Sequence, residues 1–141
     1  MRTDGMADMP WGPALELGHA QLDADHRSLV ETLNRLRGAV REDRGREEIQ
    51  AVLVFLRDYA VSHFATEESL MLQHRYPAAP AHLSAHADLV MQLSDLVAGY
   101  RAGEARLTES LLAFLESWLV DHIQGLDREF GWYLRSRGLA S

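Results

Sequence analysis

Four short motifs rich in histidine and carboxylate carry the chemistry of this sequence. They are, in chain order, a lone histidine, a His/Glu pair, a His/His pair and a His/Asp pair: His26, His63 with Glu67, His82 with His86, and His122 with Asp127. Residues four apart in a helix point to one face about one turn apart, so such a pair can direct two donor atoms at one point. Imidazole and carboxylate groups in this pattern, within apolar helical surroundings, predict a metal site inside a helical bundle.

The number of candidate ligands bears on the number of metal ions. Five imidazoles and two carboxylates exceed the needs of one ion, since structural zinc takes four protein ligands and catalytic zinc three. Two ions are therefore predicted. If both carboxylates and one solvent oxygen bridge two octahedral ions, about eleven of twelve coordination positions are filled and one stays open. The five-residue step from His122 to Asp127 turns about 500°, an offset that suits a carboxylate reaching between two ions.

The composition excludes several kinds of metal site and partner. With no cysteine in 141 residues, the chain cannot form disulfides, iron-sulfur clusters or thiolate zinc sites. The formal net charge of -7 and the scattered basic residues argue against a nucleic-acid partner, which needs a basic surface. The length is that of one domain, so a single domain is expected over residues 1–141.

No segment predicts a membrane anchor or an export signal. Residues 1–10 contain acidic side chains and no apolar core. No later run reaches the roughly 18 uncharged apolar residues that a spanning helix needs. We therefore expect a cytoplasmic protein without membrane insertion.

Four amphipathic helices are predicted to position the motifs. Apolar residues that recur at three- and four-residue steps predict helices over about 23–41, 47–73, 81–99 and 108–125. Asp23 and Thr108 are the expected N-caps. Pro77 and Pro80 predict a loop between the second and third helices, because neither can donate a backbone hydrogen bond.

Short connections predict an all-α, up-down-up-down four-helix bundle, since short loops force neighbouring helices to be antiparallel. The metal-binding bundle is expected to span 22–127, preceded by an arm over 1–18 that Trp11 anchors. The tail 128–141 is expected to add a short helix. The four motifs lie early, late, early and late in their helices. In an up-down-up-down bundle these positions all fall at the same end. Unrelated core histidines would not share one level, so this agreement favours a joint site.

The motifs resemble those of the hemerythrins, and a cysteine-free single domain is similar to the bacterial members of that family. The resemblance covers about 11–127. It implies a non-haem di-iron centre with an oxo or hydroxo bridge, in which His82, His86 and His122 hold one iron. His26 and His63 would hold the other, with Glu67 and Asp127 bridging. The implied function is reversible binding of dioxygen for transport, storage or delivery, and not catalysis.

Four apolar residues near the motifs are candidates for an oxygen pocket: Leu29, Phe64, Trp118 and Ile123. They could wall the open position and exclude water and protons. The alternative is that they are ordinary core.

Several nearby residues are predicted to stay outside the site. His19 and His74 lie outside the pattern and are interpreted as non-ligands. Glu68, five residues after His63, is interpreted as a solvated neighbour. Met71 and Met91 are predicted to fill the core.

Two other functions stay open at this point. A di-iron oxidase or peroxidase is disfavoured, because bundle enzymes of that type use carboxylate-rich shells with Glu-x-x-His motifs. A stand-alone oxygen or iron sensor is the other alternative. An oxygen-consuming enzyme is a candidate recipient of the dioxygen, and the oligomeric state is left open.

Overall fold

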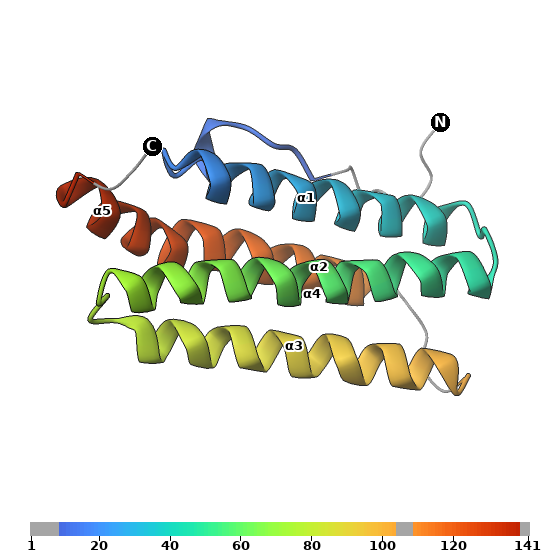
Figure 1. Ribbon diagram of the computed structural model, residues 1–141. Helices are drawn as coiled ribbons and strands as arrows, with labels where there is room; N and C mark the ends of the chain where they lie inside the picture. Colours follow the sequence, from blue (N-terminus) through green and yellow to red (C-terminus); the bar gives the residue numbers. More distant parts are fainter. Residues whose placement is uncertain (1–8, 104–108, 139–141) are drawn as a thin grey trace.

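The computed structural model describes residues 9–103 and 109–138, which contain helices and no strand. The bundle consists of α1 (Ala20–Arg41), α2 (Arg46–Gln73), α3 (Ala79–Arg101) and α4 (Glu109–His122). A 3-10 turn, η1 (Pro13–Leu15), precedes them, and a π-helical segment, η2 (Ile123–Asp127), leads into α5 (Arg128–Ser136). Figure 1 shows the up-down-up-down order, which confirms the predicted fold. The starts of α1 and α3, the end of α2 and α5 lie at the same end of the bundle.

The connection between α2 and α3 is a loop, as predicted, but α3 begins slightly earlier than expected. The loop turns at Arg75, whose φ is 54°. Pro80 lies in the first turn of α3 and not before it. A proline is tolerated there because the N–H it lacks would have no partner inside the helix. The helix therefore starts at Ala79 and places His82 in its first turn.

The N-terminal boundary of α1 differs from the prediction. The N-cap is His19, whose Nδ1 accepts a hydrogen bond from the Leu22 amide at 3.3 Å. Asp23, the predicted cap, instead accepts from the backbone amides of Leu17 at 2.7 Å and Gly18 at 3.1 Å. Gly18 has a φ of 86°, in the left-handed region that glycine adopts without steric cost. Asp23 thus fixes the turn by which the arm enters the helix.

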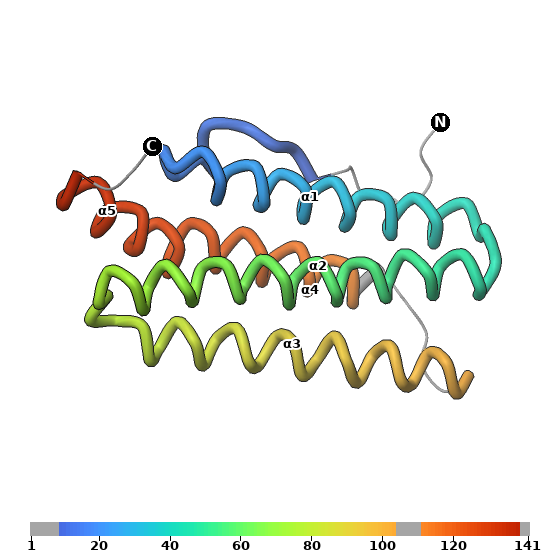
Figure 2. The backbone as a smooth tube through the Cα atoms, viewed as in Figure 1, coloured from blue at the N-terminus to red at the C-terminus, as the bar shows by residue number. Residues whose placement is uncertain are grey.

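The arm from residue 9 onward lies along α1 (Figure 2). Met9 and Leu17, and not Trp11, are its most buried described residues, each with 3% of its surface exposed. The side chain of Asn34 accepts from the Met9 amide at 2.8 Å and donates to the Met9 carbonyl at 2.9 Å. Trp11 is half-buried against the core. The predicted anchoring role of Trp11 is therefore shared, with Met9 making the specific contacts.

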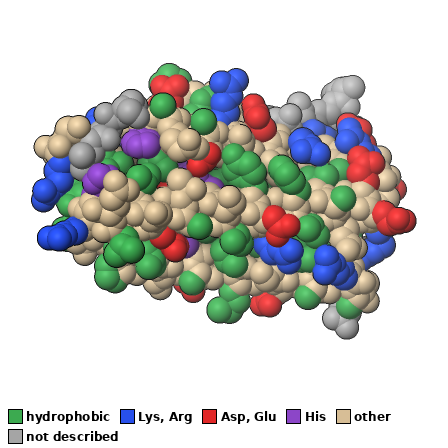
Figure 3. All heavy atoms as spheres, viewed as in Figure 1, with side chains coloured by type: hydrophobic (Ala, Val, Ile, Leu, Met, Phe, Trp, Pro, Cys, Tyr) green, Lys and Arg blue, Asp and Glu red, His purple; other side chains and the backbone are tan. Residues whose placement is uncertain are grey.

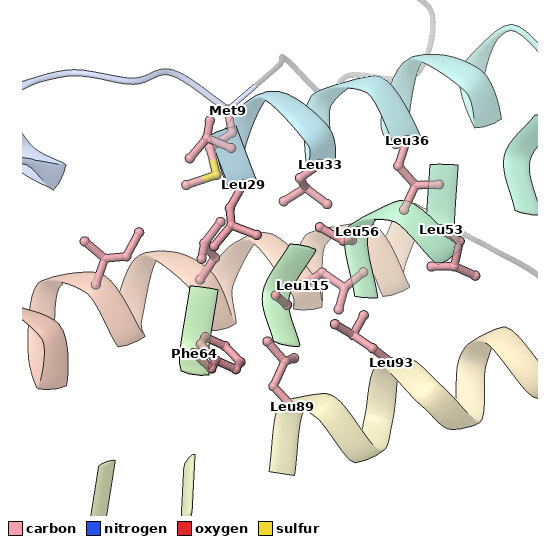
Figure 4. Packing of buried hydrophobic residues seen from close by; sticks show 14 of the residues in the cluster. Met9, Leu29, Leu33, Leu36, Leu53, Leu56, Phe64, Leu89, Leu93 and Leu115 are labelled. Atoms are coloured by element: carbon pink, nitrogen blue, oxygen red, sulfur yellow. The ribbon is translucent and has the colours of Figure 1, made fainter. Parts of the chain in front are cut away.

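Leucines from all four bundle helices meet along the axis (Figure 4). Met71 is buried with 1% exposed, as predicted, whereas Met91 is 61% exposed. Each residue of a helix turns about 100°, so Met91, two positions from both Leu89 and Leu93, faces away from the side those leucines bury. The predicted N-cap Thr108 lies outside the described residues.

The fourth helix was predicted to end near Gly125, and this boundary is wrong. The chain stays helical through η2 and continues directly into α5, which confirms the expected short C-terminal helix. The Tyr133 hydroxyl of α5 donates to the His74 carbonyl at the end of α2, at 2.5 Å. The C-terminal segment therefore closes the end of the bundle that carries the histidine motifs.

Candidate metal centre

The structure brings all seven predicted ligands together at the end of the bundle that α5 closes. Each is buried, with at most 6% of its surface exposed. Their donor atoms form two groups that share one carboxylate: His26, His63 and Glu67 in the first, and Glu67, His82, His86, His122 and Asp127 in the second. We call these the two-histidine group and the three-histidine group. Each is compact enough to hold a metal ion.

Glu67 lies between the two groups and directs one oxygen at each. Its Oε2 is 3.1 Å from His26 Nε2 and 3.0 Å from His63 Nε2. Its Oε1 is 3.1 Å from His86 Nε2 and 3.7 Å from His82 Nε2. A carboxylate in this position can bridge two ions without changing its orientation.

Asp127 divides its oxygens in the same way. Its Oδ2 is 3.0 Å from His26 Nε2. Its Oδ1 is 2.7 Å from His82 Nε2 and 3.2 Å from His122 Nε2. Both carboxylates therefore face the imidazoles of both groups.

The π-helical segment η2 explains how Asp127 reaches this position. An α-helix would turn the five-residue step from His122 to one side. A π-helix closes i to i+5 hydrogen bonds, which places residues five apart nearly above one another. The predicted sideways offset is thus largely removed, because the backbone widens over Ile123–Asp127. His122 and Asp127 consequently converge on the three-histidine group.

The contacts among the imidazoles fit a metal better than a protein-only cluster. His122 Nε2 is 3.2 Å from His82 Nε2 and 3.1 Å from His86 Nε2, so three ring nitrogens face one another. Within the described chain, His63 Nε2, Glu67 Oε1 and Asp127 Oδ2 are buried without a well-formed hydrogen bond. Buried polar atoms normally have partners. Lone pairs that converge without enough protons between them are suited to coordinate cations.

The charges of the cluster are balanced by its histidines when no metal is bound. Burial and the neighbouring Asp127 raise the pKa of Glu67, but the close imidazoles of His26, His63 and His86 outweigh them and hold that pKa well below its usual value. Burial lowers the pKa of His26, and the contacts with Asp127 and Glu67 more than offset this, raising it to about 10. Metal binding would replace such protons.

This balance predicts a pH-dependent stability for the iron-free protein. The pKa of His26 is about 10 in the fold and 6.5 without it. The contribution of His26 to the free energy of unfolding is therefore complete below about pH 6.5 and is lost as the pH rises towards 10. We expect the free energy of unfolding of the iron-free protein, from urea titrations, to fall across that interval. In the iron-loaded protein, where metal replaces the proton, this loss should be absent. Equal profiles for the two forms would contradict the prediction.

Aromatic side chains cover the three-histidine group. Phe64 stacks on His86, with ring centroids 3.8 Å apart and planes 4° apart. Trp118 stacks on His122 at 4.5 Å and 12°. An apolar cavity of about 30 Å³ borders these rings and is lined by leucines of all four helices, with Leu29 among them. Figure 4 shows Leu29 and Phe64 pointing towards this region. Ile123 is fully buried in η2 but does not line the cavity.

Two acidic residues take part in the site although the sequence analysis gave them no such role. Glu68, interpreted as a solvated neighbour, is 36% exposed, yet its Oε2 accepts from His86 Nδ1 at 2.9 Å. Asp25 Oδ2 accepts from His63 Nδ1 at 3.0 Å. Both contacts join different helices, and no spacing within one helix signals them. His19 and His74 lie outside the two groups, at the ends of α1 and α2.

A four-helix bundle with a two-ion centre of histidines and carboxylates at one end defines a class of helical-bundle metalloproteins. Residues 17–131 match the family described as the Hemerythrin HHE cation binding domain. A bacteriohemerythrin of Methylococcus capsulatus is 34% identical over 129 residues, covering 89% of this chain and 96% of the relative. A myohemerythrin of Riftia pachyptila is 28% identical over 120 residues, covering 85% and 88%.

Solved structures agree with the sequence relatives. A wild-type hemerythrin crystal structure superposes with a TM-score of 0.84 at 32% identity, covering 89% of this chain and 96% of the other. This chain therefore belongs to the hemerythrin family. Its cofactor is accordingly a non-haem di-iron centre, and the cluster has the nitrogen and oxygen donors for it.

Proposed function

We propose that this protein binds dioxygen reversibly at the di-iron centre, for oxygen transport, storage or delivery. The observation that carries the proposal is the unequal division of imidazoles around two shared carboxylates. One group has three histidines and the other has two, while Glu67 and Asp127 serve both. Three imidazoles and two carboxylate oxygens would hold the first ion and two imidazoles and two carboxylate oxygens the second, so the second would have one protein ligand fewer. A small molecule can occupy the remaining position.

The ligand roles follow from this division. We assign His82, His86 and His122 to one iron and His26 and His63 to the other. Glu67 and Asp127 bridge. The bound di-iron pair supplies the reversible electron exchange that holding dioxygen requires. The chain supplies the ligands and the surroundings.

The surroundings favour binding without further reaction. Phe64 and Trp118 lie flat against two ligand rings, and the bordering cavity is lined by apolar residues. A dry apolar space of this kind admits an apolar gas, while water finds no hydrogen-bond partners in it. We propose that Leu29, Phe64 and Trp118 form the wall of the oxygen pocket. The role of Ile123 in that pocket stays a prediction.

Catalysis is not part of the proposal. The ligand set contains five imidazoles and two carboxylates, in contrast to the carboxylate-rich shells of bundle oxidases. On the face shown in Figure 3, acidic and basic side chains are intermixed, and we propose no nucleic-acid partner. None of the described helices is long and apolar enough to cross a membrane. A cytoplasmic location and an oxygen-consuming recipient stay predictions.

The function is tested by loading the protein with ferrous iron under anaerobic conditions and then admitting air. We expect a visible charge-transfer absorption that disappears when the oxygen is removed under vacuum and returns on re-exposure. Conversion to a ferric form after one exposure, without reversal, would favour an oxidase over an oxygen carrier.

The two-ion geometry also predicts the metal content. Protein expressed in iron-replete medium should contain two irons per chain and negligible zinc, because Glu67 and Asp127 each divide their oxygens between two groups. Elemental analysis against protein concentration measures this. A reproducible ratio of one iron per chain would contradict the bridging arrangement.

A further inference from the structure

Two carboxylates outside the proposed ligand set hydrogen-bond to ligand imidazoles from behind. His63 Nδ1 donates to Asp25 Oδ2 at 3.0 Å, and His86 Nδ1 donates to Glu68 Oε2 at 2.9 Å. The Nε2 atoms of the same two rings face Glu67 at 3.0 and 3.1 Å. An acceptor behind the ring keeps the proton on Nδ1 and leaves the Nε2 lone pair free for a metal.

These two contacts are divided between the two sides of the centre. His63 belongs to the two-histidine group and His86 to the three-histidine group. Within the described chain, the Nδ1 atoms of His26 and His82 are buried without a hydrogen-bond partner. Each group therefore contains one imidazole with a carboxylate behind it and at least one without a partner on Nδ1.

The two carboxylates also differ in their surroundings. Asp25 is 13% exposed, and its second oxygen accepts from Gln21 Nε2 at 2.8 Å, so it is held on both sides. Glu68 is 36% exposed and lies on the wall of a surface groove between α2 and α3, beside Leu83 and Val90. A charge is less screened where it is less exposed. Asp25 should therefore act more strongly on its histidine than Glu68.

We propose that Asp25 and Glu68 are positioning residues that set the orientation and donor strength of His63 and His86, so that the two irons are tuned separately. This inference rests on the proposed iron centre. A carboxylate acceptor increases the electron density of the ring, and a more strongly donating imidazole stabilises the ferric ion relative to the ferrous ion. The chain can thus adjust one iron without altering the ligands of the other.

The test is a potentiometric titration of the iron-loaded protein with Asp25→Asn, Glu68→Gln and both changes together. Each amide keeps an oxygen acceptor for the ring but removes the charge. We expect each single change to raise the potential of a different one of the two one-electron steps, and the double change to raise both. Effects at independent sites add. The control is Glu31→Gln, which removes an equal charge from a side chain on α1 that is 63% exposed. This change should leave the potentials of both one-electron steps unchanged.

Azide provides a second measurement, because an anion probes the unfilled position directly. Asp25 lies behind a ligand of the two-histidine group, so Asp25→Asn should strengthen azide binding to the ferric protein, because a less strongly donating imidazole leaves that ferric ion more electron-deficient. Glu68→Gln should change it less. Loss of iron from either variant, with Glu31→Gln retaining two irons, would also support a positioning role, since weakened outer contacts lower metal affinity by about 10- to 100-fold.

Two results would overturn the inference: unchanged potentials and azide affinity in fully iron-loaded variants, or both variants shifting the same step. Neither measurement uses dioxygen. If the potentials shift as expected while oxygen binding proves irreversible, the proposed function fails and the positioning roles stand.

Discussion

Replacing Glu67 by alanine should release iron from both positions of the centre. Glu67 is completely buried and contributes a donor atom to both groups. Its removal takes one oxygen ligand from each ion and leaves the site short of an anion. Even outer contacts to metal ligands are worth about 10- to 100-fold in affinity, so the loss of a bridge should exceed that range. The measurement is iron content after dialysis against a weak chelator.

His74→Ala is the matched control for this experiment. His74 lies at the end of α2, seven positions beyond Glu67, and its backbone carbonyl, not its ring, accepts from Tyr133. The substitution keeps that carbonyl, so we expect iron content and helical circular dichroism to be unchanged. Equal iron retention in the two variants would show that the ligand assignment at this end of α2 is wrong.

Substituting Trp118 by alanine should greatly accelerate the decay of the oxygenated protein to the ferric form. Trp118 stacks on His122 at 4.5 Å and lines the apolar cavity together with Phe64. Without the indole, water and protons can approach the bound gas. Full truncation of a buried tryptophan costs about 3–5 kcal/mol, and Trp118 is only half-buried, so the fold should survive. The measurement is the decay rate of the visible absorption, with iron content checked in parallel.

Trp132→Ala serves as its control. Trp132 is 59% exposed on α5, so the same change of residue type opens no path to the centre. Its decay rate should equal that of the unmodified protein. If Trp118→Ala retains two irons and also decays at that rate, Trp118 is ordinary core and the pocket wall lies elsewhere.

The candidate ligands could be found in the sequence because their spacing is local. The pairs His63/Glu67 and His82/His86 rest on helical periodicity alone, which short-range backbone geometry determines. The bundle order followed from the short connections, and it required the four motifs to meet at one end. The structure places them there, with every candidate ligand buried.

Features that depend on contacts between elements were not predictable in this way. Asp23 was expected to cap α1, but the arm supplies backbone amides to it and His19 becomes the cap. The helical periodicity of residues 47–73 predicts that Phe55 faces the core, but Phe55 is 46% exposed, beneath the guanidinium of Arg35. Periodicity identifies an apolar stripe, whereas the rotation of the helix against its neighbours decides which edge of that stripe is buried.

The site itself shows where the local pattern stops being sufficient. Residue types and spacing indicate that His122 and Asp127 belong together, but their spacing does not predict the π-helical segment that aligns them. Asp25 and Glu68 reach their histidines across helix boundaries, at 3.0 and 2.9 Å. Spacing along one helix specifies which side chains share a face of that helix. Only the packing of several helices decides which side chains stand behind that face, and here they are the carboxylates that orient the ligands.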